Sequence, residues 1–133
     1  ADRPRGRVER SETVELTRMD SAAKKLPAGL PEVLQAAHQV FINLTTDRIL
    51  RIEVLTQAVR KGEEAAPALT EIAQIAHKIA GVAGTLGYPE IGDNARAIEQ
   101  KLKADIASGD PMRNWASVSA QIEALLDDLE ALL

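Results

Sequence analysis

The sequence predicts an all-α protein, an antiparallel four-helix bundle with an additional short N-terminal helix. Apolar residues recur every three or four positions over most of the 133-residue chain, as they do on the buried face of a helix. Hydrophobic residues make up 45% of the chain but aromatic residues only 2%. The core must therefore consist of aliphatic side chains, which suits packing of helix on helix better than packing of sheets.

The helical pattern begins at Leu30 and Pro31, and we expect the bundle to occupy residues 26–133. Residues 1–25 are expected to form a flexible basic tail or linker, because arginines gather there without a sustained apolar period. Residues 1–30 carry seven basic and five acidic side chains, whereas the remainder carries nine basic and fifteen acidic ones. This asymmetry marks a boundary, and the length suits one domain rather than two.

Five apolar stripes define the expected helices. The first stripe slips at residues 45–47, as it would at a kink or a new N-cap, and resumes until Gly62. The third helix runs from about Pro67 to Gly87, and the fourth ends before residue 108. The last begins with Asp110 as its N-cap and Pro111 as its first residue. The stripes consist of Leu34, Ala37, Phe41 and Leu44; Ile49, Ile52, Leu55 or Thr56, and Val59; Leu69, Ile72, Ala76, Ile79, Ala83 and Leu86; Ile91, Ala95, Ile98 and Leu102; and Trp115, Val118, Ile122, Leu125, Leu129 and Leu132.

Composition excludes several classes of function. The absence of cysteine excludes disulfides and thiolate metal sites. No apolar run reaches the roughly 18 residues of a membrane span, and no signal peptide is recognisable, so we expect a cytoplasmic protein without membrane contact. A net charge of −4 argues against nucleic-acid binding. Neither a ligand-spaced metal cluster nor a glycine-rich nucleotide loop is present, and we expect no metal or cofactor of the chain's own.

One stretch, residues 75–88, combines a histidine with several glycines. His77 lies one position away from the apolar stripe, and Gln74, Gly81 and Gly84 lie on its face of the helix. Each glycine weakens a helix by about 1 kcal/mol relative to alanine, so their clustering indicates that a partner approaches this backbone closely. A neutral imidazole offers a nucleophilic nitrogen near pH 7. The stretch therefore predicts an exposed, reactive histidine beside an open docking surface.

The run from Ala76 to Tyr88 resembles the signature of histidine phosphotransfer (Hpt) domains, and the resemblance extends over about residues 30–133. It implies a phosphocarrier without ATP-dependent kinase activity. His77 would take a phosphoryl group from an aspartate of one response-regulator receiver domain and pass it to another, in a bacterial two-component phosphorelay. An upstream hybrid histidine kinase is the other implied partner. The resemblance places the magnesium ion on the receiver and not on this chain.

The resemblance also implies a hydrogen-bond partner that holds the proton on one imidazole nitrogen. This partner is expected on the following helix, about twenty residues after the histidine. Glu99 occupies that position, with Gln100 and Asn94 as alternatives. An ordinary solvated helix residue remains an equal interpretation of Glu99.

The source of positive charge for the phosphoryl group is left open. Many Hpt domains carry lysine three residues after the histidine, but this chain has Ala80 there. Lys78 lies about 100° round the helix from His77, so it can flank the site and contact the phosphoryl group or the partner. Arg96, on the facing helix, is another candidate, whereas Lys101 and Lys103 are expected to lie further away.

Two other interpretations of the whole chain are retained. One is a non-catalytic helical module that docks a partner through the glycine face without phosphotransfer. The other concerns context, namely that the chain is the C-terminal Hpt domain of a hybrid sensor kinase. The second histidine, His38, lies beside an apolar stripe without glycine neighbours and is assigned no function.

Overall fold

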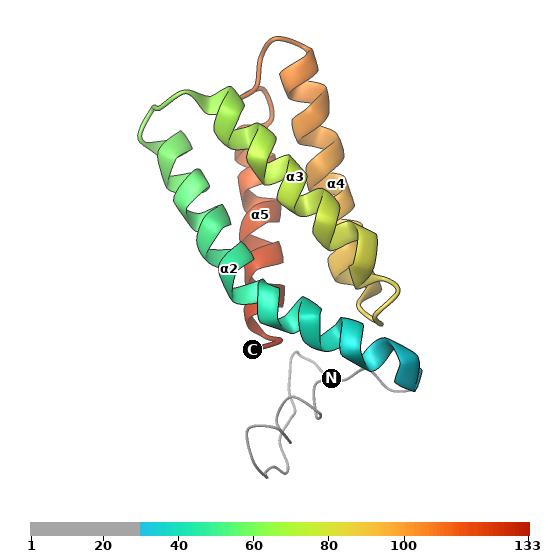
Figure 1. Cartoon of the computed structure of the whole chain (residues 1–133). Coiled ribbons are helices and arrows are strands. Elements are labelled where there is room, and N and C mark those ends of the chain that lie inside the picture. The colour runs from blue at the N-terminus through green and yellow to red at the C-terminus, as the bar shows by residue number, and fades with distance from the viewer. Residues whose placement is uncertain (1–29) are drawn as a thin grey trace.

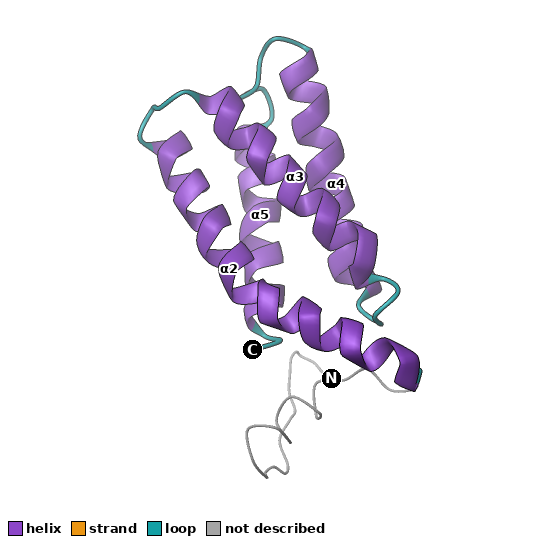
Figure 2. Ribbon diagram, in the orientation of Figure 1, coloured by secondary structure: helices purple, strands orange, loops and turns teal. Residues whose placement is uncertain are grey.

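The computed structural model describes residues 30–133, and this range folds into four helices without strands (Figure 1, Figure 2). A 3-10 turn at Glu32–Leu34 leads into α2 (Gln35–Arg60), followed by α3 (Ala65–Ala83), α4 (Pro89–Ala107) and α5 (Trp115–Glu130). Figure 1 shows α3 and α4 as a hairpin, with α5 behind and α2 along the other side of α3. The all-α class is confirmed. The tail expected over residues 1–25 lies outside the described residues.

The core is aliphatic, as the composition requires. All four helices contribute to it, and the stripes expected for α3, α4 and α5 are largely buried. Burying one such aliphatic side chain contributes about 1.5–3 kcal/mol to folding. The most completely buried aliphatic residues are Ile52, Leu69, Ile72, Ile79, Ile98, Leu102, Val118, Ile122, Leu125 and Leu129. Within residues 30–133, no helix is long and apolar enough to cross a membrane.

Helix α2 is continuous over 26 residues, so the slipped stripe marks a kink and not a new N-cap, and residues 31–44 do not form a separate short helix. Thr45 takes the stripe position that was assigned to Leu44. It is 1% exposed, and its Oγ1 donates a hydrogen bond of 2.7 Å to the carbonyl oxygen of Phe41. Such a bond to the preceding turn bends a helix, and Figure 1 shows the bend that carries the first half of α2 beneath the α3–α4 hairpin.

The turn between α3 and α4 depends on Gly87, whose φ of +95° few residues other than glycine adopt. The amide of Tyr88 donates to the carbonyl of Ala83 at 2.8 Å, and the amide of Gly87 donates to that of Gly84 at 3.2 Å. This pair of bonds is the usual way in which a left-handed glycine ends a helix. It returns the chain antiparallel, so α4 packs directly on the histidine helix.

Helix α5 begins at Trp115, later than the Asp110–Pro111 signal indicated. The reason is a tertiary contact with Asp105, a carboxylate that is 3% exposed near the end of α4. Its oxygens accept hydrogen bonds from the backbone amide and the side-chain amide of Asn114, at 3.2 and 2.8 Å. These bonds hold residues 111–114 in a turn and satisfy a carboxylate that would otherwise be buried without partners.

His38 and Tyr88 join the start of α2 to the turn between α3 and α4. His38 faces the core in place of the expected Ala37, and it is 2% exposed. Its Nε2 shares a hydrogen bond of 2.7 Å with the Tyr88 hydroxyl, and the Tyr88 ring stacks on Phe41. Burial lowers the pKa of His38 and raises the pKa of Tyr88 to about 12. Both groups are therefore neutral in the folded protein near pH 7.

This burial predicts a loss of stability in mild acid. Below pH 6.5 the unfolded chain binds a proton at His38 that the folded chain resists, so the free energy of unfolding falls by up to about 1.4 kcal/mol per pH unit. Chemical denaturation at pH 7, 6 and 5 measures the slope. A His38→Gln variant, which places a non-titrating amide beside Tyr88 instead of the imidazole, should show a smaller slope. An unchanged slope in this variant would assign the acid sensitivity to other groups.

Candidate functional site

His77 projects from the middle of the exposed face of α3. Its side chain is 72% exposed, whereas its neighbours Ala76 and Ile79 are buried, with exposed fractions of 1% and 0%. The periodicity of the helix fixes this arrangement, because a residue next to the buried stripe is turned about 100° away from it. The imidazole is therefore held on a rigid helix and is open to a second molecule.

Glu99, on α4, lies beside the imidazole. Its Oε2 is 2.8 Å from His77 Nδ1, and its side chain is only 13% exposed. An ionised carboxylate accepts hydrogen bonds and cannot donate them, so Nδ1 must carry the proton in this contact. In the neutral ring, Nε2 is then left with its lone pair.

The two alternatives to Glu99 lie in different surroundings. Gln100 lines a shallow hollow together with His77, but it makes no hydrogen bond to the imidazole among the described contacts. Asn94 donates its side-chain amide to the backbone carbonyl of Gln121 at 3.3 Å and so faces α5. Of the three candidates, the structure brings Glu99 into contact with His77.

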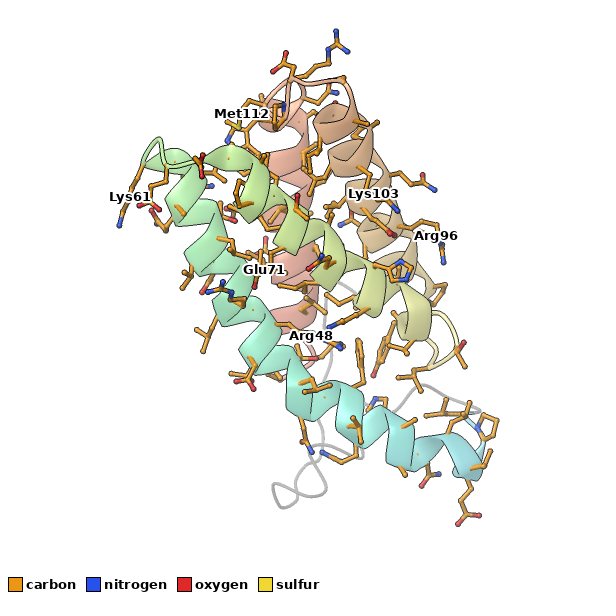
Figure 3. All side chains as sticks on the ribbon, turned by 45° about the horizontal axis from the view of Figure 1, so that its top comes forward. Arg48, Lys61, Glu71, Arg96, Lys103 and Met112 are labelled. Carbon is orange, nitrogen blue, oxygen red and sulfur yellow. The ribbon has the colours of Figure 1, made fainter. Side chains whose placement is uncertain are left out.

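Two cations of α4, Arg96 and Lys103, line a hollow together with His77, and Figure 3 shows both side chains extending from α4. Lys103 Nζ is 3.7 Å from Glu99 Oε2, and Lys103 lines both of the hollows that His77 lines. Arg96 lines one of these hollows and also contacts Asp93 at 3.4 Å. Lys101 instead donates to the hydroxyl of Ser117. The expectation that Lys103 lies further away from the site was wrong. Its position four residues after Glu99, one turn along the same face of the helix, could have indicated this contact.

The larger of the two hollows is a groove of about 660 Å³ between α3 and α4. Gln74, Lys78 and Lys103 contribute polar groups to it, and Ile106 lines its apolar end. Lys78 is exposed and makes no ion pair among the described residues. Lys78 of α3 and Lys103 of α4 therefore line the same groove as the imidazole.

The glycines of α3 differ from the glycine that faces them. A Cβ added at Gly81 or Gly84 would have no atom within 4 Å, so both backbone positions are open to solvent. A Cβ added at Gly92 of α4 would lie 3.3 Å from the backbone nitrogen of Gly84 and 3.6 Å from the Cβ of Ala83. Gly92 therefore permits the close approach of the two helices, a role that its position beside the stripe residue Ile91 could have indicated.

The arrangement can support transfer of a group to and from an exposed nitrogen nucleophile. A carboxylate fixes the proton on the far side of the ring, and cations stand where an anionic group would arrive. Within residues 30–133, no three His, Asp or Glu side chains are grouped as metal ligands would be.

Comparison with known proteins gives one family. The sequence model described as Hpt domain matches residues 30–132. No curated protein and no solved structure shows a significant match to the chain.

The glycine geometry predicts opposite effects of one substitution at two positions. Gly81→Ala should raise the free energy of unfolding by up to about 1 kcal/mol, because alanine favours the helix and meets no neighbour. Gly92→Ala should lower it by about 1 kcal/mol or more, because the methyl group meets the backbone of α3. Urea denaturation of both variants measures the difference. Equal effects would contradict the assignment of one open and one packed glycine.

Proposed function

The chain belongs to the Hpt domain family, and on that premise we propose that it relays a phosphoryl group through His77 between aspartates of receiver domains. Hpt domains act in two-component signalling and are phosphocarriers rather than kinases. The single observation that carries the proposal is the pairing of an exposed imidazole with a largely buried carboxylate, at 2.8 Å between His77 Nδ1 and Glu99 Oε2.

In the proposed step, the lone pair of His77 Nε2 attacks the phosphorus atom of an aspartyl phosphate. A nitrogen–phosphorus bond forms, the bond between phosphorus and the aspartate oxygen breaks, and the receiver regains a free carboxylate. Passing the group to a second receiver reverses these changes. No proton must leave the ring, because the proton on Nδ1 stays in its hydrogen bond with Glu99 throughout. The step needs no nucleotide and no general base.

Glu99 contributes to this step in two ways. It holds the reactive tautomer, and it faces the positive charge that develops on the ring when Nε2 bonds to phosphorus. A charge placed in advance where charge develops in the transition state lowers the barrier without any later rearrangement. Glu99 is 13% exposed, so its interaction with the ring is less screened than that of a surface carboxylate.

We assign the cation for the phosphoryl group to Lys103, with Lys78 and Arg96 as further sources of positive charge. Position 80, where many Hpt domains have lysine, holds an alanine that is 8% exposed and packs near Gly92. Lys103 lines both hollows beside His77, and its side chain is 68% exposed, so its amine can turn from Glu99 toward an incoming anion. The magnesium ion would be held by the receiver domain.

The docking surface of the proposed complex is the open backbone at Gly81 and Gly84, together with Gln74. The absence of side chains there lets the receiver bring its aspartyl phosphate close to Nε2. A misplacement of about 1 Å can cost on the order of 100-fold in rate. The proposed partners are receiver domains and the hybrid kinase that supplies the first of them.

The proposal predicts that His77→Gln folds normally and acquires no phosphoryl group. Purified receiver domains, phosphorylated beforehand, are incubated with the chain, and radiolabel on the chain is measured together with its resistance to alkali. Wild type should acquire an acid-labile, alkali-stable label, as expected of phosphohistidine. The His77→Gln variant should acquire none, although it still contains His38. Label on His77→Gln would remove His77 from the mechanism. Binding of a receiver without any label on wild type would favour the non-catalytic interaction module.

A second prediction concerns Glu99. Glu99→Ala should slow transfer by about 10- to 100-fold, because the tautomer is no longer held. Nitrogen-15 NMR of the His77 ring should show less of the Nδ1-protonated form, while Glu99→Gln, which keeps an acceptor oxygen, should retain more of it. Gln100→Ala is the matched control on the same turn of α4 and should leave both measurements unchanged. A normal rate in Glu99→Ala would contradict the assigned role.

A further inference from the structure

A second groove lies beside the His77 site, between the first half of α2 and the C-terminal end of α3. It measures about 470 Å³ and is lined mainly by aliphatic side chains. Val40, Leu44 and Val82 line it and remain 56%, 41% and 41% exposed. Single exposed apolar residues are common on protein surfaces, but several gathered in one groove mark a binding surface.

This groove continues the surface around the phosphoacceptor. Gly81 lines both the hollow that contains His77 and the apolar groove, so the two are contiguous across an open stretch of backbone. A domain that seats its phosphoaspartate at His77 therefore also reaches the groove. The inference below rests on the proposed function, since it takes that domain to be the occupant.

Arg48 is the one charged residue among those that line the groove. Figure 3 shows its side chain extending from α2 toward α3. Its Nη1 is buried and has no hydrogen-bond partner within the described part of the chain. The other arginines at the centre and end of α2 are paired, Arg51 with Glu71 and Arg60 with Glu123. Burial also lowers the pKa of Arg48.

A buried donor such as Nη1 without an acceptor is unfavourable, and rotation of the half-buried Arg48 side chain to meet an acceptor on the partner removes this cost on binding. A carboxylate fits best, because it matches the planar fork of arginine and carries the complementary charge. We propose that Arg48 is a specificity-determining residue: an aspartate or glutamate on the receiver face that lies against the groove pairs with its guanidinium. Arg48 thereby selects among receivers, because one without the carboxylate leaves Nη1 unpaired, as it is in the free chain.

The apolar side chains and Arg48 have separate roles in this arrangement. Aliphatic contacts supply affinity, but they accept any apolar surface of suitable shape. Pairing of the donor adds affinity only for a receiver that carries the carboxylate, a distinction that aliphatic contacts alone cannot provide. Arg48 acts on the choice of receiver and not on the reacting atoms.

The test measures kcat/KM for phosphotransfer from His77 to each member of a panel of purified receiver domains from the source organism. Three chains are compared: wild type, Arg48→Met, which keeps the length of the aliphatic stem, and Arg51→Met, whose arginine lies outside the groove. His77 is loaded with phosphoramidate, a small donor that needs no docking surface. Phosphoramidate loading should be the same in all three, and thermal melting should show that all three are folded.

We expect Arg48→Met to lower kcat/KM for the preferred receiver by about 10-fold or more, through KM rather than kcat, and to narrow the gap between preferred and poor receivers. Arg51→Met should behave as wild type. If Arg48→Met fails to fold, Arg48→Lys keeps the charge without the planar fork and should show a smaller loss in the same direction. The charges can also be exchanged between the two proteins. Arg48→Glu should transfer poorly to the unchanged receiver, and transfer should be restored when the receiver's aspartate or glutamate is replaced by arginine.

Unchanged or improved transfer by folded Arg48→Met would overturn the inference while leaving the proposed function intact. Failure of the wild-type chain to exchange a phosphoryl group with any receiver would overturn both. The two failures are distinguished within one experiment, because the second is seen with wild type and the first only with the variant.

Discussion

The close packing of α3 on α4 is the constraint on which the rest of the site depends. Gly92 faces the backbone of Gly84 at a distance that leaves little room for a methyl group, and the neighbouring residues Ala80 and Ala83 are also small. The hairpin turn that Gly87 closes brings the two helices together at this end. Because the helices approach so closely, a short glutamate side chain on α4 reaches the imidazole on α3.

The two histidines show how the fold separates structural and chemical uses of one side chain. His38 is buried and bonded to Tyr88, where it ties α2 to the hairpin turn. His77 makes one hydrogen bond, through Nδ1, and is otherwise exposed. A polar ring in the core must be satisfied by its neighbours, whereas a ring that is to react must keep one nitrogen free.

The charge around His77 differs in sign from that of the bundle. Residues 31–133 carry nine basic and fifteen acidic side chains, yet Lys78, Arg96 and Lys103 all line the hollows beside the imidazole. Exposed charges act over roughly 10 Å or less at physiological salt. The local cations therefore govern an arriving phosphoryl group more than the net charge does, and the buried donor of Arg48 extends this positive character into the apolar groove.

The sequence by itself determined the all-α class, the buried stripes of α3, α4 and α5, and the exposure of His77, because helical periodicity is a local property of the chain. Only the tertiary structure decided which of three candidates meets the imidazole and that Lys103 stands beside it. It also decided that Thr45 bends α2 and that Asp105 delays the start of α5. These outcomes depend on how one helix is rotated against another, and a shift of one residue turns a side chain by about 100°.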